Sequence, residues 1–130
     1  MTQTWLITGV SGGLGREIAL AAIARGDLVF GTVRKAEAAE AFERLGGRAL
    51  VLDVTDEAAV RAGVAQAEAA AGRIDILVNN AGYGLVGAVE EASLDEVRAQ
   101  FETNVIGPLA MLKAVLPAMR ARRAGRIINI

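Results

Sequence analysis

Short apolar runs alternate with amphipathic segments along the whole chain. The apolar runs near residues 4–8, 28–33, 49–54, 74–79 and 126–130 predict β-strands. Between them, apolar residues recur at helical spacing, which predicts an α/β fold in which helices cover both faces of a parallel sheet. No repeat, low-complexity tract or linker interrupts the 130 residues, so we expect a single domain.

Polar residues and glycines mark the ends of the first three predicted helices. The first covers about residues 14–25 and ends at Gly26, and the second covers about residues 36–45. Thr55 is the expected N-cap of the third helix, which ends at Gly72.

Ser93 and Glu96 have the spacing of a capping box and predict the start of a fourth helix. Its apolar stripe includes Leu94, Val97 and Phe101. Pro108 and Pro117 follow in the same long segment, and we expect them to kink or divide it.

The composition excludes several kinds of chemistry and partner. Lys and Arg number 14 against 15 Asp and Glu, so no charge excess points to nucleic acid or to an anionic membrane. The chain has no histidine and no cysteine, so we expect no metal site, disulfide or thiolate chemistry. No secretory signal pattern and no apolar run near the roughly 20 residues of a membrane span occur, and we expect a cytoplasmic protein.

A glycine-dense turn follows the first apolar run and opens the first helix. This order of strand, glycine turn and helix predicts a phosphate cradle, because free backbone N–H groups and the helix dipole converge on an anion there. The residues that we expect to contact the phosphates are Gly9, Ser11, Gly12, Gly13, Leu14 and Gly15. Gly9 allows the tight turn, Gly13 the approach of backbone to phosphate, and Gly15 the close packing of helix on strand. A flexible surface loop is the alternative interpretation.

The turn, Thr8-Gly9-Val10-Ser11-Gly12-Gly13-Leu14-Gly15, resembles the T-G-x-x-x-G-x-G motif of the short-chain dehydrogenase/reductase family. Taken alone it also fits T-G-x-x-G-x-x-G, which is typical of the extended epimerase and dehydratase branch. A second segment, Asn79-Asn80-Ala81-Gly82, ends a predicted strand and resembles the N-N-A-G motif of the short-chain branch. Its amides can bond a neighbouring backbone and a ribose, although a plain Asn/Gly turn has the same composition.

The resemblance implies a Rossmann-like, doubly wound parallel sheet with strand order 3-2-1-4-5. It covers essentially all 130 residues but only roughly the first half to two-thirds of a family domain. We therefore expect a dinucleotide-binding domain over residues 1–130 that lacks the C-terminal helix–strand units. Asn80, Ala81 and Gly82 are expected to contact the cofactor.

The end of the second predicted strand decides, in this family, between NAD and NADP. No carboxylate stands there, and Arg34 can offer its planar guanidinium to a 2′-phosphate. We therefore expect NADP(H) over NAD(H), although Arg34 and Lys35 could also be a solvated basic pair. Asp53 matches the family's aspartate beside the adenine ring, with Val54 supplying backbone contacts, or else Asp53 only begins the approach to the third helix.

The resemblance also implies hydride transfer between a nicotinamide and a carbonyl or alcohol substrate, with a tyrosine, a lysine four residues later, a serine and an asparagine in the site. Asn104 matches the asparagine, and an ordinary core or surface amide is the alternative. The only tyrosine is Tyr83, with Gly87 four residues later, so the chain contains no Tyr-x-x-x-Lys. Tyr83 is expected to line the nicotinamide side without acting as catalyst. The two functional hypotheses are the cofactor portion of an NADP-dependent oxidoreductase and a non-catalytic NADP(H)-binding module.

Without the C-terminal units, one face of the fourth and fifth strands is expected to lack helix cover. Its apolar residues are Ile74, Ile76, Val78, Ile127, Ile128 and Ile130. Large exposed apolar patches seek partners, so we expect a homo-oligomer.

Overall fold

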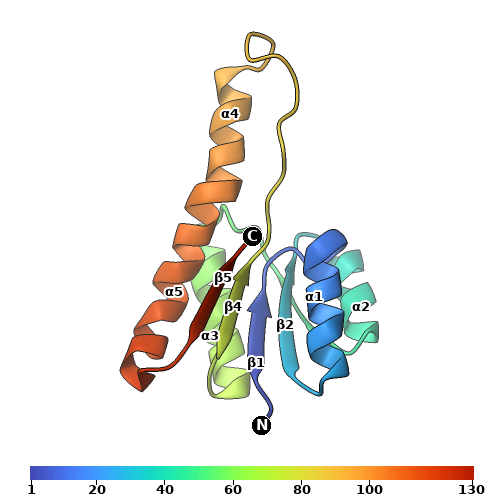
Figure 1. The fold of residues 1–130 in the computed structure, drawn as a ribbon, viewed down its shortest axis with the longest axis vertical. Helices are drawn as coiled ribbons and strands as arrows, with labels where there is room; N and C mark the ends of the chain where they lie inside the picture. Colours follow the sequence, from blue (N-terminus) through green and yellow to red (C-terminus); the bar gives the residue numbers. More distant parts are fainter.

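A computed structural model describes all residues 1–130 and shows a five-stranded parallel sheet of order β3-β2-β1-β4-β5 (Figure 1). The strands are β1 (Thr4–Ile7), β2 (Leu28–Val33), β3 (Arg48–Val51), β4 (Ile76–Asn79) and β5 (Arg126–Asn129). The predicted fold class and strand order are confirmed.

The helices are α1 (Gly13–Ala24), α2 (Ala36–Arg44), α3 (Glu57–Ala71), α4 (Leu94–Phe101) and α5 (Gly107–Arg122), with a π-helical turn, η1 (Glu102–Ile106), between the last two. They include two pairs that cover the two faces of the sheet: α1 with α2 on one face, and α3 with α5 on the other (Figure 1). One apolar cluster lies under α1 and α2 and includes Ile7, Val29 and Phe42. The other lies under α3 and α5 and includes Leu6, Val60 and Met111. Alternate residues of β1 therefore point into separate cores, as strand geometry requires.

The connection from β3 to α3 differs from the prediction. The strand ends at Val51, and the carboxylate of Asp53 accepts hydrogen bonds from the Thr55 backbone N–H at 2.9 Å and the Thr55 hydroxyl at 2.8 Å. Thr55 is thus drawn into a turn around Asp53. Asp56 is the N-cap instead, and its side chain accepts from the Ala59 N–H at 3.0 Å. The prediction of Thr55 as cap is wrong, because a carboxylate one residue on takes the free helix amide.

The predicted capping box of Ser93 and Glu96 is confirmed at the start of α4. The division of the long segment lies at η1, just before Pro108, which occupies the first turn of α5. Pro117 lies inside α5, which continues through it, so the expected second break is wrong.

α4 extends beyond the sheet and buries none of its residues (Figure 1). Two residues of the expected apolar stripe are exposed, Leu94 at 68% and Phe101 at 56% of full exposure, and Val97 is half-buried. The stripe packs on no core of this chain.

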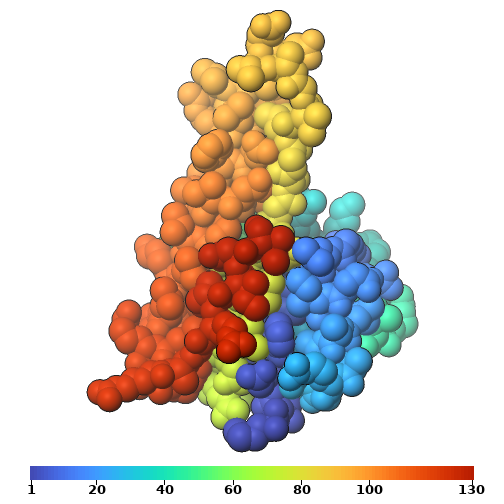
Figure 2. Space-filling model, in the orientation of Figure 1, coloured from blue at the N-terminus to red at the C-terminus, as the bar shows by residue number.

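The expected bare face of β4 and β5 is only partly found. Ile74, Ile76 and Val78 are buried, since the two apolar clusters enclose them. Ile127 and Ile128 are half-buried and Ile130 is exposed. Figure 2 shows β5, in red, uncovered beside α1. No helix has both the length and the apolar character that crossing a membrane requires.

Candidate functional site: a cleft at the carboxyl end of the sheet

The turn between β1 and α1 has the backbone that a phosphate cradle needs. Gly9 and Gly13 have φ values of +72° and +59°, in the left-handed region that favours glycine. The N-cap is Gly12, in extended backbone, and no side chain caps the helix. The first N–H groups of α1 therefore lack intrahelical or side-chain acceptors and face the cleft with the positive end of the helix dipole.

Gly15, in the first turn of α1, allows the helix to approach the end of β4. A Cβ on Gly15 would collide with the Asn80 side-chain amide and with the Gly9 carbonyl. The same Cβ on Gly12 would meet nothing within 4 Å. Gly15 is thus required by packing, as predicted, and it lies behind the cleft instead of lining it.

Two side chains tie the glycine turn to the Asn79–Gly82 segment. The hydroxyl of Thr8 accepts hydrogen bonds from the N–H groups of Asn80 and Ala81, both at 2.9 Å. The Asn80 side chain donates to the carbonyls of Thr8 and Gly9, both at 3.1 Å. The backbone role expected for one of the paired asparagines is therefore present.

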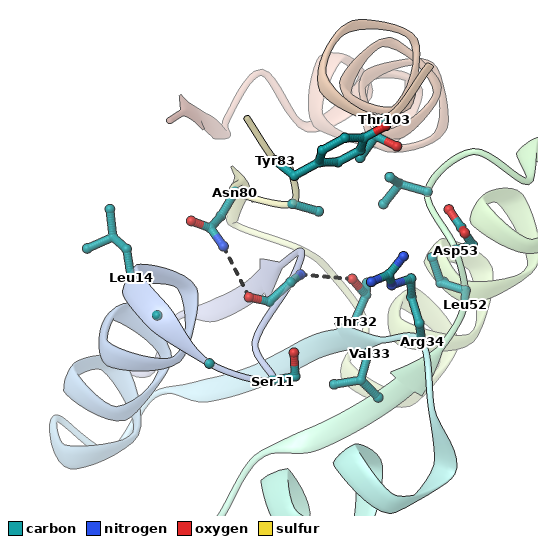
Figure 3. Close-up of a pocket in the computed structure, with 16 residues that line it drawn as sticks. Ser11, Leu14, Thr32, Val33, Arg34, Leu52, Asp53, Asn80, Tyr83 and Thr103 are labelled. Carbon is teal, nitrogen blue, oxygen red and sulfur yellow. Dashed lines mark hydrogen bonds between the residues drawn. The ribbon is translucent and has the colours of Figure 1, made fainter. Parts of the chain in front are cut away.

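A cleft of about 650 Å³ opens between the glycine turn and the ends of β2, β3 and β4 (Figure 3). Of the predicted cofactor residues, all but Gly15 line it: Gly9, Ser11, Gly12, Gly13, Leu14, Arg34, Asp53, Val54, Asn80, Ala81 and Gly82. Carboxyl ends of parallel strands meet at one edge of a sheet, which explains why segments so distant in sequence share one cleft.

Sequence reasoning missed two polar residues of this cleft, Thr32 and Thr103. Thr32 lies within the apolar run of β2 and is only 3% exposed. A hydroxyl at a fully buried strand position is the signal that could have singled it out, because such a group needs a hydrogen-bond partner.

Arg34 and Asp53 occupy the same end of the cleft (Figure 3). Arg34 is exposed and belongs to none of the four ion pairs in the chain. Asp53 carries the hydrogen bonds of Thr55 described above. Arg34 therefore keeps its full set of donors available, whereas part of the Asp53 carboxylate is already engaged.

Asn104 lies in η1 and holds the chain that follows β4. Its side-chain oxygen accepts from the Tyr83 N–H at 3.0 Å, and its side-chain nitrogen donates to the Tyr83 carbonyl at 2.8 Å. Asn104 lines a second cleft of about 570 Å³, and Tyr83 lines both clefts. Residues 84–89, which follow Tyr83, line neither cleft, and Val86 and Val89 are exposed.

Asn79 is the buried member of the asparagine pair. Its side-chain nitrogen donates to the Asn129 side-chain oxygen at 2.9 Å, and this bond joins the ends of β4 and β5. Its own side-chain oxygen has no partner in the chain.

The comparison with protein families agrees with this geometry. The short chain dehydrogenase family model matches residues 3–130. The chain belongs to the short-chain dehydrogenase family. This family and its fold account for the glycine turn, the Asn79–Gly82 segment and the strand order together.

Similar proteins within the short-chain dehydrogenase family are longer than this chain. A 3-ketodihydrosphingosine reductase of Bacteroides thetaiotaomicron is 46% identical over 129 residues, which are 98% of this chain and 46% of that protein. A short-chain dehydrogenase of Streptomyces avermitilis superposes with a TM-score of 0.94 at 44% identity, over 99% of this chain and 49% of that one. A metagenomic short-chain oxidoreductase solved in complex with NADP has a TM-score of 0.89 at 34% identity, over 98% of this chain and 60% of that one. The chain thus spans about half the length of the relatives it matches.

Proposed function

We propose that residues 1–130 bind NADP(H) and form the cofactor-binding part of an oxidoreductase that moves a hydride between the nicotinamide and a carbonyl or alcohol substrate. The observation that carries this proposal is the single cleft shared by the uncapped N-terminus of α1 and the unpaired Arg34. The N-terminus of α1 suits a pyrophosphate, and the guanidinium of Arg34 suits a 2′-phosphate.

The residues present fit a nicotinamide dinucleotide. The left-handed Gly9 and Gly13 would bring backbone N–H groups against the pyrophosphate, and a Cβ on Gly9 would lie 3.1 Å from the Ala81 Cα. Ser11, Gly12 and Leu14 complete this cradle, while Asp53 and Val54 would flank the adenine. Asn80, Ala81 and Gly82 would lie along the ribose and nicotinamide portion. A cleft of about 650 Å³ is within the usual range for cofactor sites.

The preference for NADP over NAD depends on Arg34. Its guanidinium is exposed, always charged and shaped to bond a phosphate with two N–H groups. β2 ends at Val33 and is followed by Arg34 and Lys35, so no carboxylate stands at this strand end to accept a hydrogen bond from a ribose 2′-hydroxyl. The NADP complex of the metagenomic relative is consistent with this preference.

The test is a comparison of dissociation constants for NADP+ and NAD+ in wild type and Arg34→Ala. The variant should bind NADP+ about 10–100-fold more weakly, with NAD+ affinity unchanged, because one charge-assisted phosphate contact is lost. Lys35→Ala is the matched control, since Lys35 is the neighbouring exposed cation and does not line the cleft. Tighter NAD+ binding by the wild type, or an unchanged NADP+ preference in Arg34→Ala, would refute the assignment.

When bound, the nicotinamide supplies or accepts the hydride. Residues of this chain would position the backbone that surrounds the nicotinamide. Asn104 engages both of its side-chain groups with the Tyr83 backbone and so orients the Gly82–Tyr83 chain at the junction of the two clefts. In the whole protein, Asn104 would complete a water-mediated proton relay, the role that the asparagine at this place has in the family.

Binding without turnover is the second candidate function for residues 1–130. It is favoured by Gly87, which stands where a lysine would follow Tyr83 in a Tyr-x-x-x-Lys motif. NADPH fluorescence distinguishes the candidates: the binding module shows a saturable change without oxidation of NADPH by added carbonyl compounds. Turnover that survives Tyr83→Phe would exclude Tyr83 from the chemistry.

We also propose that the protein is a homo-oligomer. Exposed apolar side chains follow one another at helical spacing through α4, η1 and α5: Leu94, Phe101, Val105, Leu109 and Leu116. Such a stripe is typical of an interface. The two ends of this helical segment differ in charge, with Asp95 and Glu96 at one end and Arg120 and Arg122 at the other. Antiparallel packing of two copies would bring opposite charges together.

A further inference from the structure

The backbone of Gly9, which opens the glycine turn, is held from both sides. Its carbonyl accepts from the Asn80 side chain at 3.1 Å, and its N–H donates to the hydroxyl oxygen of Thr32 at 3.1 Å. Figure 3 draws both bonds, from opposite walls of the cleft. The turn is therefore fastened to β4 by Asn80 and to β2 by Thr32.

Thr32 makes a second bond to the same turn. Its backbone carbonyl accepts from the N–H of Val10 at 3.1 Å. The N–H groups of Gly9 and Val10 thus both donate to Thr32. Thr32 is 3% exposed, so water cannot replace it as the acceptor. Loss of the hydroxyl would leave the Gly9 N–H without an acceptor in a partly buried setting.

Thr32 also lies two residues before Arg34, and β2 ends between them at Val33. The β-strand backbone is stiff and its register against β1 is set, with Gly31 opposite Ile7. The bonds of Thr32 to the turn therefore help to set the distance between the glycine turn and Arg34.

We propose that Thr32 is a positioning residue that holds the pyrophosphate cradle at a set distance from Arg34, so that both phosphate groups of NADP are engaged at once. This inference rests on the proposed function. Thr32 acts on the cradle through the Gly9 N–H, from which its hydroxyl oxygen accepts a hydrogen bond.

The experiment compares two ligands on the full chain. NADP+ reaches both phosphate subsites, whereas adenosine 2′-monophosphate reaches only the Arg34 end. Thr32→Val keeps the β-branched shape and removes the acceptor. It should weaken NADP+ binding about tenfold and change adenosine 2′-monophosphate binding less than about twofold. Thr32→Ser, which restores the hydroxyl, should return NADP+ affinity to near wild type.

Thr4→Val is the matched control, because Thr4 is also a buried strand threonine, at 6% exposure, but lies at the opposite end of the sheet. It should leave both affinities unchanged. Thr32→Ala replaces the valine variant if the latter does not fold. Equal losses for both ligands, or NADP+ affinity in Thr32→Val equal to wild type, would overturn the inference. Failure of the wild type to bind either ligand would instead overturn the proposed function.

Discussion

Free backbone N–H groups are treated differently at the amino end of the sheet and at the N-terminus of α1, which lies at the carboxyl end. At the amino end, carboxylates of the chain itself accept the free N–H groups. Asp27 accepts from the Gln3 N–H at 3.0 Å and the Trp5 indole at 3.1 Å, and Asp75 accepts from the Thr4 N–H at 2.8 Å. At the carboxyl end, Asp56 caps α3 in the same way, but the N-terminus of α1 has no side-chain acceptor.

The difference supports the proposed cofactor site at the N-terminus of α1. An anion supplied by the chain closes the amino end, and an anion supplied by a ligand suits the carboxyl end. Orphan backbone donors are costly where they are buried, so a cleft that exposes several of them without a cap is a stronger functional signal than its shape alone. Changes at the two ends should therefore separate stability from cofactor binding.

The largest effect is expected from Gly15→Ala, at the packing contact behind the cradle. The new Cβ collides with the Asn80 amide and the Gly9 carbonyl, so helix and strand must move apart. We expect a loss of about 1–3 kcal/mol in the free energy of unfolding and a loss of NADP+ binding. Denaturant titration and ligand fluorescence measure the two. Gly12→Ala is the control, with no expected loss of stability because its Cβ meets open space.

Asp27→Ala, at the amino end of the sheet, should lower stability without changing cofactor binding. It leaves the Gln3 N–H and the Trp5 indole without their shared acceptor, which should cost about 1–3 kcal/mol of stability. NADP+ affinity of the folded variant should equal that of the wild type. A parallel loss of affinity would show that the two ends are coupled, and the comparison drawn above would then fail.

Substitutions in the exposed apolar stripe of α4, η1 and α5 should alter the oligomeric state. They should have little effect on stability or on NADP+ binding. Phe101→Glu and Leu116→Glu place charges at exposed apolar positions of α4 and α5. In sedimentation velocity they should shift an oligomer toward monomer, while Val86→Glu, at an exposed valine of the loop before α4, should not. A wild type that sediments as a monodisperse monomer would rule out the proposed oligomer.

The smallest effect concerns acid stability. The backbone hydrogen bond from Gln3 lowers the pKa of Asp27 below its ordinary 3.8, with Trp5 and Arg25 acting in the same sense and burial opposing them. A carboxyl with a lowered folded-state pKa adds stability above its unfolded pKa, and that stability is lost as pH falls through the folded pKa. Unfolding free energies measured below about pH 5 should therefore decline less steeply in Asp27→Asn than in wild type. An equal decline of the unfolding free energy with pH in the two proteins would show that Asp27 does not contribute to acid sensitivity.

Much of the fold could be predicted because its signals are local. The alternation of apolar runs and helical patterns predicts the strands and helices, Gly26 and Gly72 end α1 and α3 with positive φ, and Ser93 and Glu96 start α4. Each of these depends on residues within a few positions of one another. The glycine turn and the Asn79–Gly82 segment also located the cleft, since carboxyl ends of parallel strands converge.

What the sequence alone determined is thus the order of elements, most of their ends and the site's place in the fold. Tertiary structure decided which distant groups meet. The burial of Ile76 and Val78 depends on how closely α1 lies over β1 and β4. The bond from Gly9 to Thr32 joins the turn after β1 to the neighbouring strand β2. Strand register and helix packing bring such partners together, and these depend on the whole core and not on any short stretch of residues.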